Sequence, residues 1–170
     1  MKLTLTNQSA RPVDEPWLRR KLQALARLLK VNGQWSITIV DDSAMKILHN
    51  RTMKDPTTTD VLTFDLRDQH QGKRQKKNAI DLDTVVCRDV AARRARDLGH
   101  SVEQELLLYS LHSLLHVQGY DDTTRPGFER MHRREDALLI ALGVGPLYHA
   151  QRRGKARPAG AKRKTKKKTA

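Results

Sequence analysis

The order in which strand-like and helix-like patterns follow one another limits this chain to one kind of fold. Strand-like patterns occupy residues 2–7, 35–40, 59–66 and 80–87, whereas apolar residues recur every three or four positions in the other segments. Helices are expected at 14–32, where Asn32 and Gly33 would end the helix, and at 41–55, 89–98, 101–117 and 126–142. The order β-α-β-α-β-β-α-α-α predicts an α+β fold, with about five helices packed on a small mixed four-stranded sheet.

The connections between the strands also predict their directions. A helix separates the first strand from the second and the second from the third, which favours partly parallel pairing. The third and fourth strands follow one another without a helix, which favours an antiparallel pair.

Positive charge is concentrated at the C-terminal end. The 170 residues carry a net charge of +14, and residues 151–170 contribute ten Lys or Arg and no acid. Because this segment lacks large apolar side chains, we expect a disordered basic tail after a single domain at residues 1–150. Such a tail either contacts nucleic-acid phosphates or only increases solubility.

A second basic cluster lies at residues 67–77, in a long loop expected between the third and fourth strands. It has little apolar character, so it either binds phosphates or is a solvated insertion. The candidate contacts to an RNA backbone are Lys54, Lys73, Arg74, Lys76 and Lys77.

Cysteine content and hydropathy bear on the compartment. With Cys87 alone, an intramolecular disulfide is impossible, which favours a reducing environment. No apolar run reaches the ~18 residues that span a bilayer, and the first residues lack the apolar core of a secretory signal. We therefore expect a cytoplasmic protein with no membrane partner.

One segment carries the residues expected of a metal site, HSLLHVQGYDD at residues 112–122. His112 and His116 are four apart on a central helix, so both imidazoles project from one face. Gly119 would end the helix and reverse the chain, returning Asp121 or Asp122 to the histidines. Two imidazoles and a carboxylate leave a position open for water, as catalytic zinc sites do. The competing interpretation is a pair of core or partner-facing histidines.

The spacing of these residues is also that of the metzincin proteases, which use a zinc ion. Those enzymes place a glutamate, their general base, directly after the first histidine. This chain has Ser113 there. The sequence therefore disfavours a protease.

The same segment resembles the HGxLHLxGYDH motif of the YbeY endoribonucleases, bacterial ribosomal-RNA maturation factors. TDVLTF at 59–64 resembles their TDVLSF strand, and DLDTVVC at 81–87 is similar to LGDIVIS. Met131 and Glu135 match a Met-x3-Glu that follows the motif. The resemblance covers about residues 1–145 and leaves the tail outside.

This resemblance implies one bound Zn²⁺ and hydrolysis of single-stranded RNA. It also implies action on the 3′ end of small-subunit ribosomal RNA, a role in ribosome quality control, and the small ribosomal subunit as partner. Position by position, His112 and His116 match the first two zinc ligands, and the third family histidine falls on Asp122.

Three positions depart from the family pattern. Asp122 offers an oxygen ligand, which zinc tolerates and which admits Mn²⁺ or another divalent ion more readily. Ser113 replaces a glycine, which a helix accepts but which brings a larger side chain toward the metal. The arginine expected before the third strand falls on Met53, so Arg51 is the candidate to stabilise charge on the scissile phosphate.

Two alternatives to a nuclease stay open. A non-catalytic ribosome- or RNA-binding factor would use the metal structurally and predicts a fourth protein ligand, such as Asp121. A metalloprotease predicts a glutamate base near the metal, and none stands at the required spacing.

Overall fold

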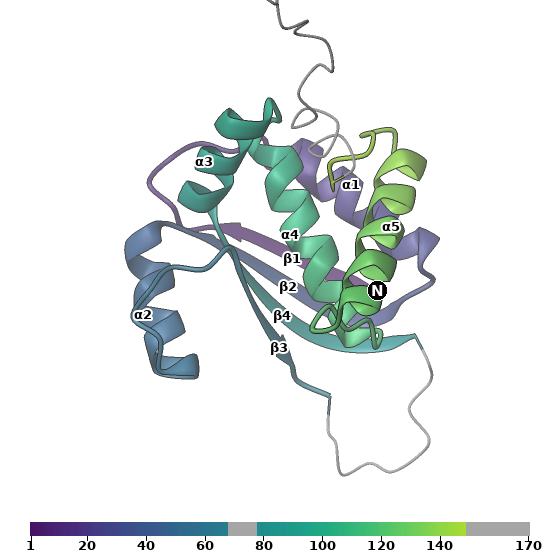
Figure 1. Cartoon of the computed structure of the whole chain (residues 1–170), viewed down its shortest axis with the longest axis horizontal. Coiled ribbons are helices and arrows are strands. Elements are labelled where there is room, and N and C mark those ends of the chain that lie inside the picture. The colour runs from purple at the N-terminus through teal and green to yellow at the C-terminus, as the bar shows by residue number, and fades with distance from the viewer. Residues whose placement is uncertain (68–77, 149–170) are drawn as a thin grey trace, which may run out of the picture.

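The computed structural model describes residues 1–67 and 78–148. Within them the elements follow the expected order (Figure 1). The strands are β1 (Lys2–Asn7), β2 (Asn32–Val40), β3 (Val61–Asp65) and β4 (Ala79–Cys87). The helices are α1 (Glu15–Leu28), α2 (Asp42–Met53), α3 (Arg88–Leu98), α4 (Val102–Val117) and α5 (Arg125–Ala141). The expected tail and most of the basic loop lie outside the described residues.

The four strands form one mixed sheet in the order β1-β2-β4-β3. β1 pairs with β2 and β2 with β4 in parallel, whereas β3 pairs with β4 antiparallel. The predicted fold class, the partly parallel sheet and the antiparallel pair of β3 and β4 are therefore confirmed. The helix between β2 and β3 does not join a parallel pair, because β4 lies between these strands and they run in opposite directions. β3 lies at one edge of the sheet.

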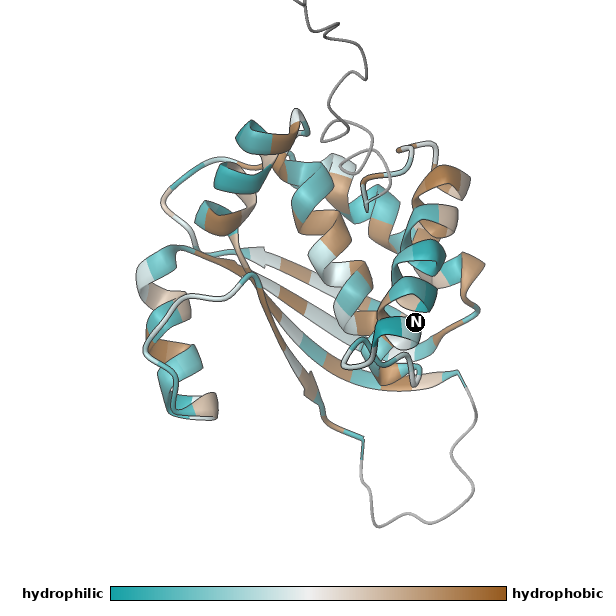
Figure 2. Cartoon of the chain, viewed as in Figure 1, coloured by the Kyte–Doolittle hydropathy of each residue, from teal (hydrophilic) through white to brown (hydrophobic). Residues whose placement is uncertain are grey.

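Two apolar clusters lie on opposite faces of this sheet. The larger one joins α1, α4 and α5 to inward residues of the strands, among them Trp35, Ile37 and Leu82, which are almost fully buried. The smaller one joins α2 to Val40, Leu62 and Cys87. Figure 2 shows hydrophobic and hydrophilic residues alternating along the strands, as a sheet with two faces requires. α4 thus lies centrally, against the sheet and between its neighbouring helices (Figure 1).

The end of α1 differs from the expected one. The helix ends at Leu28, and Lys30 takes the left-handed conformation with φ 52°. Asn32 and Gly33 are instead the first residues of β2, beside β4. A Cβ on Gly33 would lie 2.0 Å from the carbonyl oxygen of Ile80. The glycine therefore serves the close approach of two strands rather than the end of a helix.

No helix in the described part of the chain is long and apolar enough to cross a bilayer.

Asp42 joins the start of α2 to α3 and to the loop before β3. Its carboxylate accepts hydrogen bonds from Nη1 and Nη2 of Arg93, at 2.8 and 3.1 Å, and from Oγ1 of Thr58 at 2.9 Å. The bonds from Arg93 are the largest influence, and with Thr58 they outweigh burial and hold the pKa of Asp42 at about 2.

We expect Asp42→Asn to lower the free energy of unfolding by about 1–2 kcal/mol near neutral pH, since solvent screens the half-exposed Arg93. The native pKa lies below the unfolded value, so this stabilisation is complete above about pH 4 and is lost as the pH falls toward 2. Urea denaturation at several pH values measures the difference in the free energy of unfolding between the parent and the variant. A difference that stays constant on acidification would contradict a stabilising role of the ionised Asp42.

Candidate metal centre

The candidate site is built at the C-terminal end of α4. Ser101 and Gln104 form a capping box at the start of this helix. After Val117 the chain turns through Gly119, whose φ of 90° is in the left-handed region that favours glycine. This reversal brings Asp122 back beside the last turns of the helix.

Three side chains converge there. The Nε2 atoms of His112 and His116 are 3.0 Å apart. The Asp122 carboxylate oxygens lie 3.6 Å from Nε2 of His112 and 3.7 Å from Nε2 of His116. One possible ligand atom from each residue falls within 4.8 Å of the others. Asp121 is turned away, since its carboxylate accepts hydrogen bonds from the backbone N–H and hydroxyl of Thr123.

The hydrogen bonds on the far side of each imidazole fit a metal ion. Nδ1 of His112 lies 2.8 Å from Glu135 Oε1, and Nδ1 of His116 lies 3.1 Å from the carbonyl oxygen of Tyr120. Both partners are acceptors, so Nδ1 of each ring is the donor, and the two Nε2 atoms are directed toward one another. A metal ion beside these Nε2 atoms would find both imidazoles held in the orientation in which they can bind it.

The separations suit tetrahedral coordination. With metal–ligand bonds of about 2.0–2.2 Å, ligand atoms of a tetrahedral site lie about 3.3–3.5 Å apart. The three observed separations, 3.0, 3.6 and 3.7 Å, lie close to that value. His112, His116 and Asp122 therefore form a donor set that fits Zn²⁺ or a similar divalent ion.

Glu135 on α5 supports the site from behind. Its side chain is 1% exposed and accepts hydrogen bonds from Nδ1 of both His112 and His132. Burial raises the pKa of Glu135, but the two histidine bonds outweigh it, and the pKa lies below its usual value. A buried carboxylate thus fixes the proton of His112 on Nδ1.

His132 is not the exposed residue that its arginine neighbours suggest. Its side chain is 15% exposed, and its ring stacks on Tyr148 with 3.9 Å between centroids. Sequence reasoning missed the roles of Glu135 and His132. The available signal was their i, i+3 spacing on the buried face of α5.

Ser113 points away from the metal centre, which corrects the expectation of crowding. Its hydroxyl is buried against the sheet, 3.0 Å from Oγ1 of Thr63 and 2.8 Å from Oγ1 of Thr84. Trp35 Nε1 donates to the same Thr84 oxygen at 3.0 Å. This chain of hydroxyls attaches the histidine helix to three strands of the sheet.

The other candidate residues that the structure describes, Arg51 and Lys54, lie in and directly after α2 rather than on α4. Arg51 is exposed on α2, which packs on β4 and α3. Lys54 is exposed at the end of the same helix. Lys73, Arg74, Lys76 and Lys77 lie outside the described residues. A role of these side chains in RNA binding or catalysis stays a prediction.

Fold and site together define the class, an α+β protein whose central helix and following loop bring two imidazoles and a carboxylate together in an arrangement that could hold a metal ion. A family model described as Endoribonuclease YbeY matches residues 4–143. This chain belongs to that family of endoribonucleases.

Individual relatives agree. An Endoribonuclease YbeY of Clavibacter michiganensis subsp. michiganensis is 37% identical over 148 residues, which cover 85% of this chain and 97% of the relative. An Endoribonuclease YbeY of Thermobifida fusca is 34% identical over 143 residues, which cover 82% of this chain and 92% of the relative. A solution structure from Thermotoga maritima matches the fold with a TM-score of 0.56 at 18% identity, covering 93% of this chain and 99% of that one.

Proposed function

We propose that this chain is a zinc-dependent endoribonuclease of the cytoplasm. Its substrate is single-stranded RNA, and its place is the maturation of the 3′ end of small-subunit ribosomal RNA and ribosome quality control, with the small ribosomal subunit as partner. The observation that carries the proposal is the convergence of two imidazole Nε2 atoms and one carboxylate, with one possible ligand atom of each residue within 4.8 Å of the others. Membership of an endoribonuclease family supports RNA as the substrate.

The residues of the site have separate tasks in this mechanism. A bound divalent ion supplies Lewis acidity and a nucleophile at neutral pH. His112, His116 and Asp122 hold the ion, while Glu135 and the Tyr120 carbonyl keep both imidazoles in the ligating tautomer. Arg51 is the candidate to stabilise charge on the phosphate, and Lys54, Lys73, Arg74, Lys76 and Lys77 are candidates to bind the RNA backbone.

The donor set bears on metal identity and on the alternatives. One aspartate in place of a third histidine lets Mn²⁺ or another divalent ion compete with zinc. Among the described residues the cluster offers three ligands, which leaves a coordination position for water and favours catalysis over a structural metal. Ser113, in the position of a protease's glutamate base, is buried against the sheet and does not support a protease.

Metal analysis tests this proposal. Protein purified without added metal is expected to contain about one zinc per chain, and the triple variant His112→Ala, His116→Ala, Asp122→Ala is expected to contain none. Both proteins are then incubated with labelled single-stranded and duplex RNA of the same sequence. Cleavage of the single strand by the parent alone is the expected result. A parent protein that holds no metal after reconstitution, or that cleaves neither RNA, would refute the proposed enzymatic function.

A further inference from the structure

Three cavities lie around the C-terminal half of α1, and none of them is lined by His112, His116 or Asp122. The first, of about 430 Å³, shares Arg27 with the second, of about 610 Å³. The third, of about 400 Å³, shares Lys30 with the first and Leu28 with the second. The three cavities are neighbours through these shared residues, and we name the surface that they line together the α1 groove, defined by Arg20, Arg27, Leu28, Lys30, Gln118 and Arg134.

The charges of the α1 groove are all of one sign. Basic side chains line each cavity, and no acidic residue lines any of the three. None of Arg20, Arg27, Lys30 and Arg134 has an ion pair with a carboxylate of the described residues. Other arginines do: Arg67 pairs with Asp65 and Arg93 with Asp42. The groove therefore presents positive charge that the described part of the protein does not neutralise.

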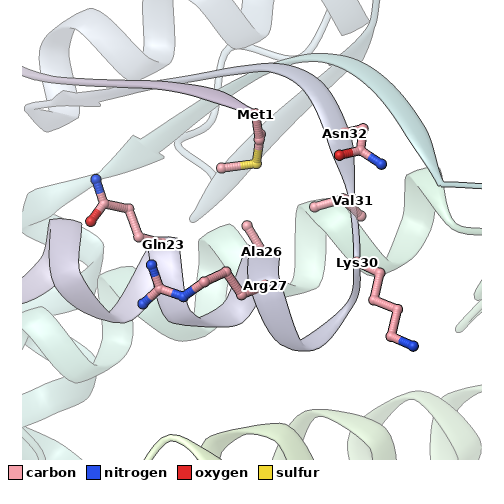
Figure 3. A pocket seen from close by; sticks show the side chains of 7 residues that line it. All are labelled: Met1, Gln23, Ala26, Arg27, Lys30, Val31 and Asn32. Carbon is pink, nitrogen blue, oxygen red and sulfur yellow. The ribbon is translucent and has the colours of Figure 1, made fainter.

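The floor of the α1 groove is apolar. In the first cavity Met1, Ala26 and Val31 turn toward one another, while Arg27 and Asn32 stand around them (Figure 3). Leu28, which is 48% exposed, lies between the second and third cavities. An apolar floor flanked by cationic side chains suits a polynucleotide. Its nucleobases are flat and apolar, and its phosphates are anionic.

The groove reaches the metal centre at one end. The third cavity is lined by Gln118 and Tyr120, which follow α4 directly. The carbonyl oxygen of Tyr120 is the one that accepts the Nδ1 proton of His116. An RNA strand that leaves the metal centre past Gln118 and Tyr120 would enter the α1 groove.

We propose that the α1 groove is a second RNA-binding surface, which holds a segment of the substrate outside the cleavage site. This inference rests on the proposed function, because RNA is its occupant. Uncompensated positive charge beside an apolar floor favours RNA over an acidic polypeptide, because the polypeptide lacks nucleobases.

The test compares two double variants of the full chain. Arg27→Gln with Lys30→Gln removes two charges from the groove. Arg11→Gln with Arg94→Gln removes two exposed charges that have no ion pair within the described residues and is the matched control. Fluorescence anisotropy measures binding of 2′-O-methyl RNAs of about 30 and about 6 nucleotides over a range of salt concentrations, and circular dichroism checks the fold.

We expect the groove variant to bind the long RNA about 5- to 10-fold more weakly, with a salt dependence shallower by about 1.4 for two lost contacts. The control variant is expected to change by less than about 2-fold, and the short RNA to bind all proteins alike. Equal losses in both variants, or none in the groove variant, would overturn the proposal. So would tighter binding of poly-glutamate than of RNA to the parent. A parent that binds the long RNA through the groove but cleaves no RNA would refute the nuclease function alone.

Discussion

His116→Ala is expected to abolish stoichiometric metal binding and to lower the rate of RNA cleavage by at least about 1,000-fold. The substitution removes one of two nitrogen ligands and leaves His112 and Asp122 as an incomplete pair. It also removes one part-buried hydrogen bond, from Nδ1 to the Tyr120 carbonyl, at the end of α4. The loss therefore falls on the metal rather than on the fold. Mass spectrometry of bound metal and a cleavage assay on the same preparation measure both effects.

Two further variants make this result specific. His49→Ala removes a histidine from α2, where its ring bonds the Thr57 carbonyl, and is expected to keep metal and activity. Asp122→His replaces the oxygen ligand with the nitrogen found in the family motif and is expected to retain zinc. Full metal content and full activity in His116→Ala would show that the three converging groups do not bind the ion.

Local patterns in the sequence were enough to predict the four strands, a partly parallel sheet and the antiparallel pair of β3 and β4. The alternation in β2 and β4 and the helical spacing in α4 depend on neighbouring residues only, and the direct link from β3 to β4 requires an antiparallel turn. The end of α1 could not be predicted in the same way. Gly33 looked like a helix stop, but its requirement comes from Ile80, a residue far along the chain.

The candidate site likewise has one part that local patterns in the sequence could predict and another part that they could not. His112, His116 and Asp122 lie within one helix and the turn after it, so their convergence could be predicted from spacing. Glu135 and the hydroxyl chain through Ser113 depend on how α5 and the sheet pack on α4. No local pattern encodes those contacts. The choice between Asp121 and Asp122 likewise needed the backbone path after Gly119.

Glu135→Gln is expected to lower the metal affinity by about 10- to 100-fold with little change in the shape of the site. Glu135 accepts a hydrogen bond from Nδ1 of each of two histidines, and an amide of the same size offers one acceptor atom and one donor atom. Where the amide donor faces His112, the ring must place its proton on Nε2, and it can no longer bind the ion. Competition with a zinc chelator measures the affinity, and thermal unfolding of the metal-free protein measures stability.

Glu105→Gln is the matched control for this effect. Glu105 is also 1% exposed and also bonds a histidine, His100, at 2.6 Å, but at the opposite end of α4. Both variants replace a buried carboxylate by its amide, so both are expected to lower the unfolding temperature. Only Glu135→Gln is expected to weaken metal binding, because only Glu135 bonds a ligand histidine. Equal metal affinities in the two variants would show that Glu135 stabilises the fold without setting the tautomer of His112.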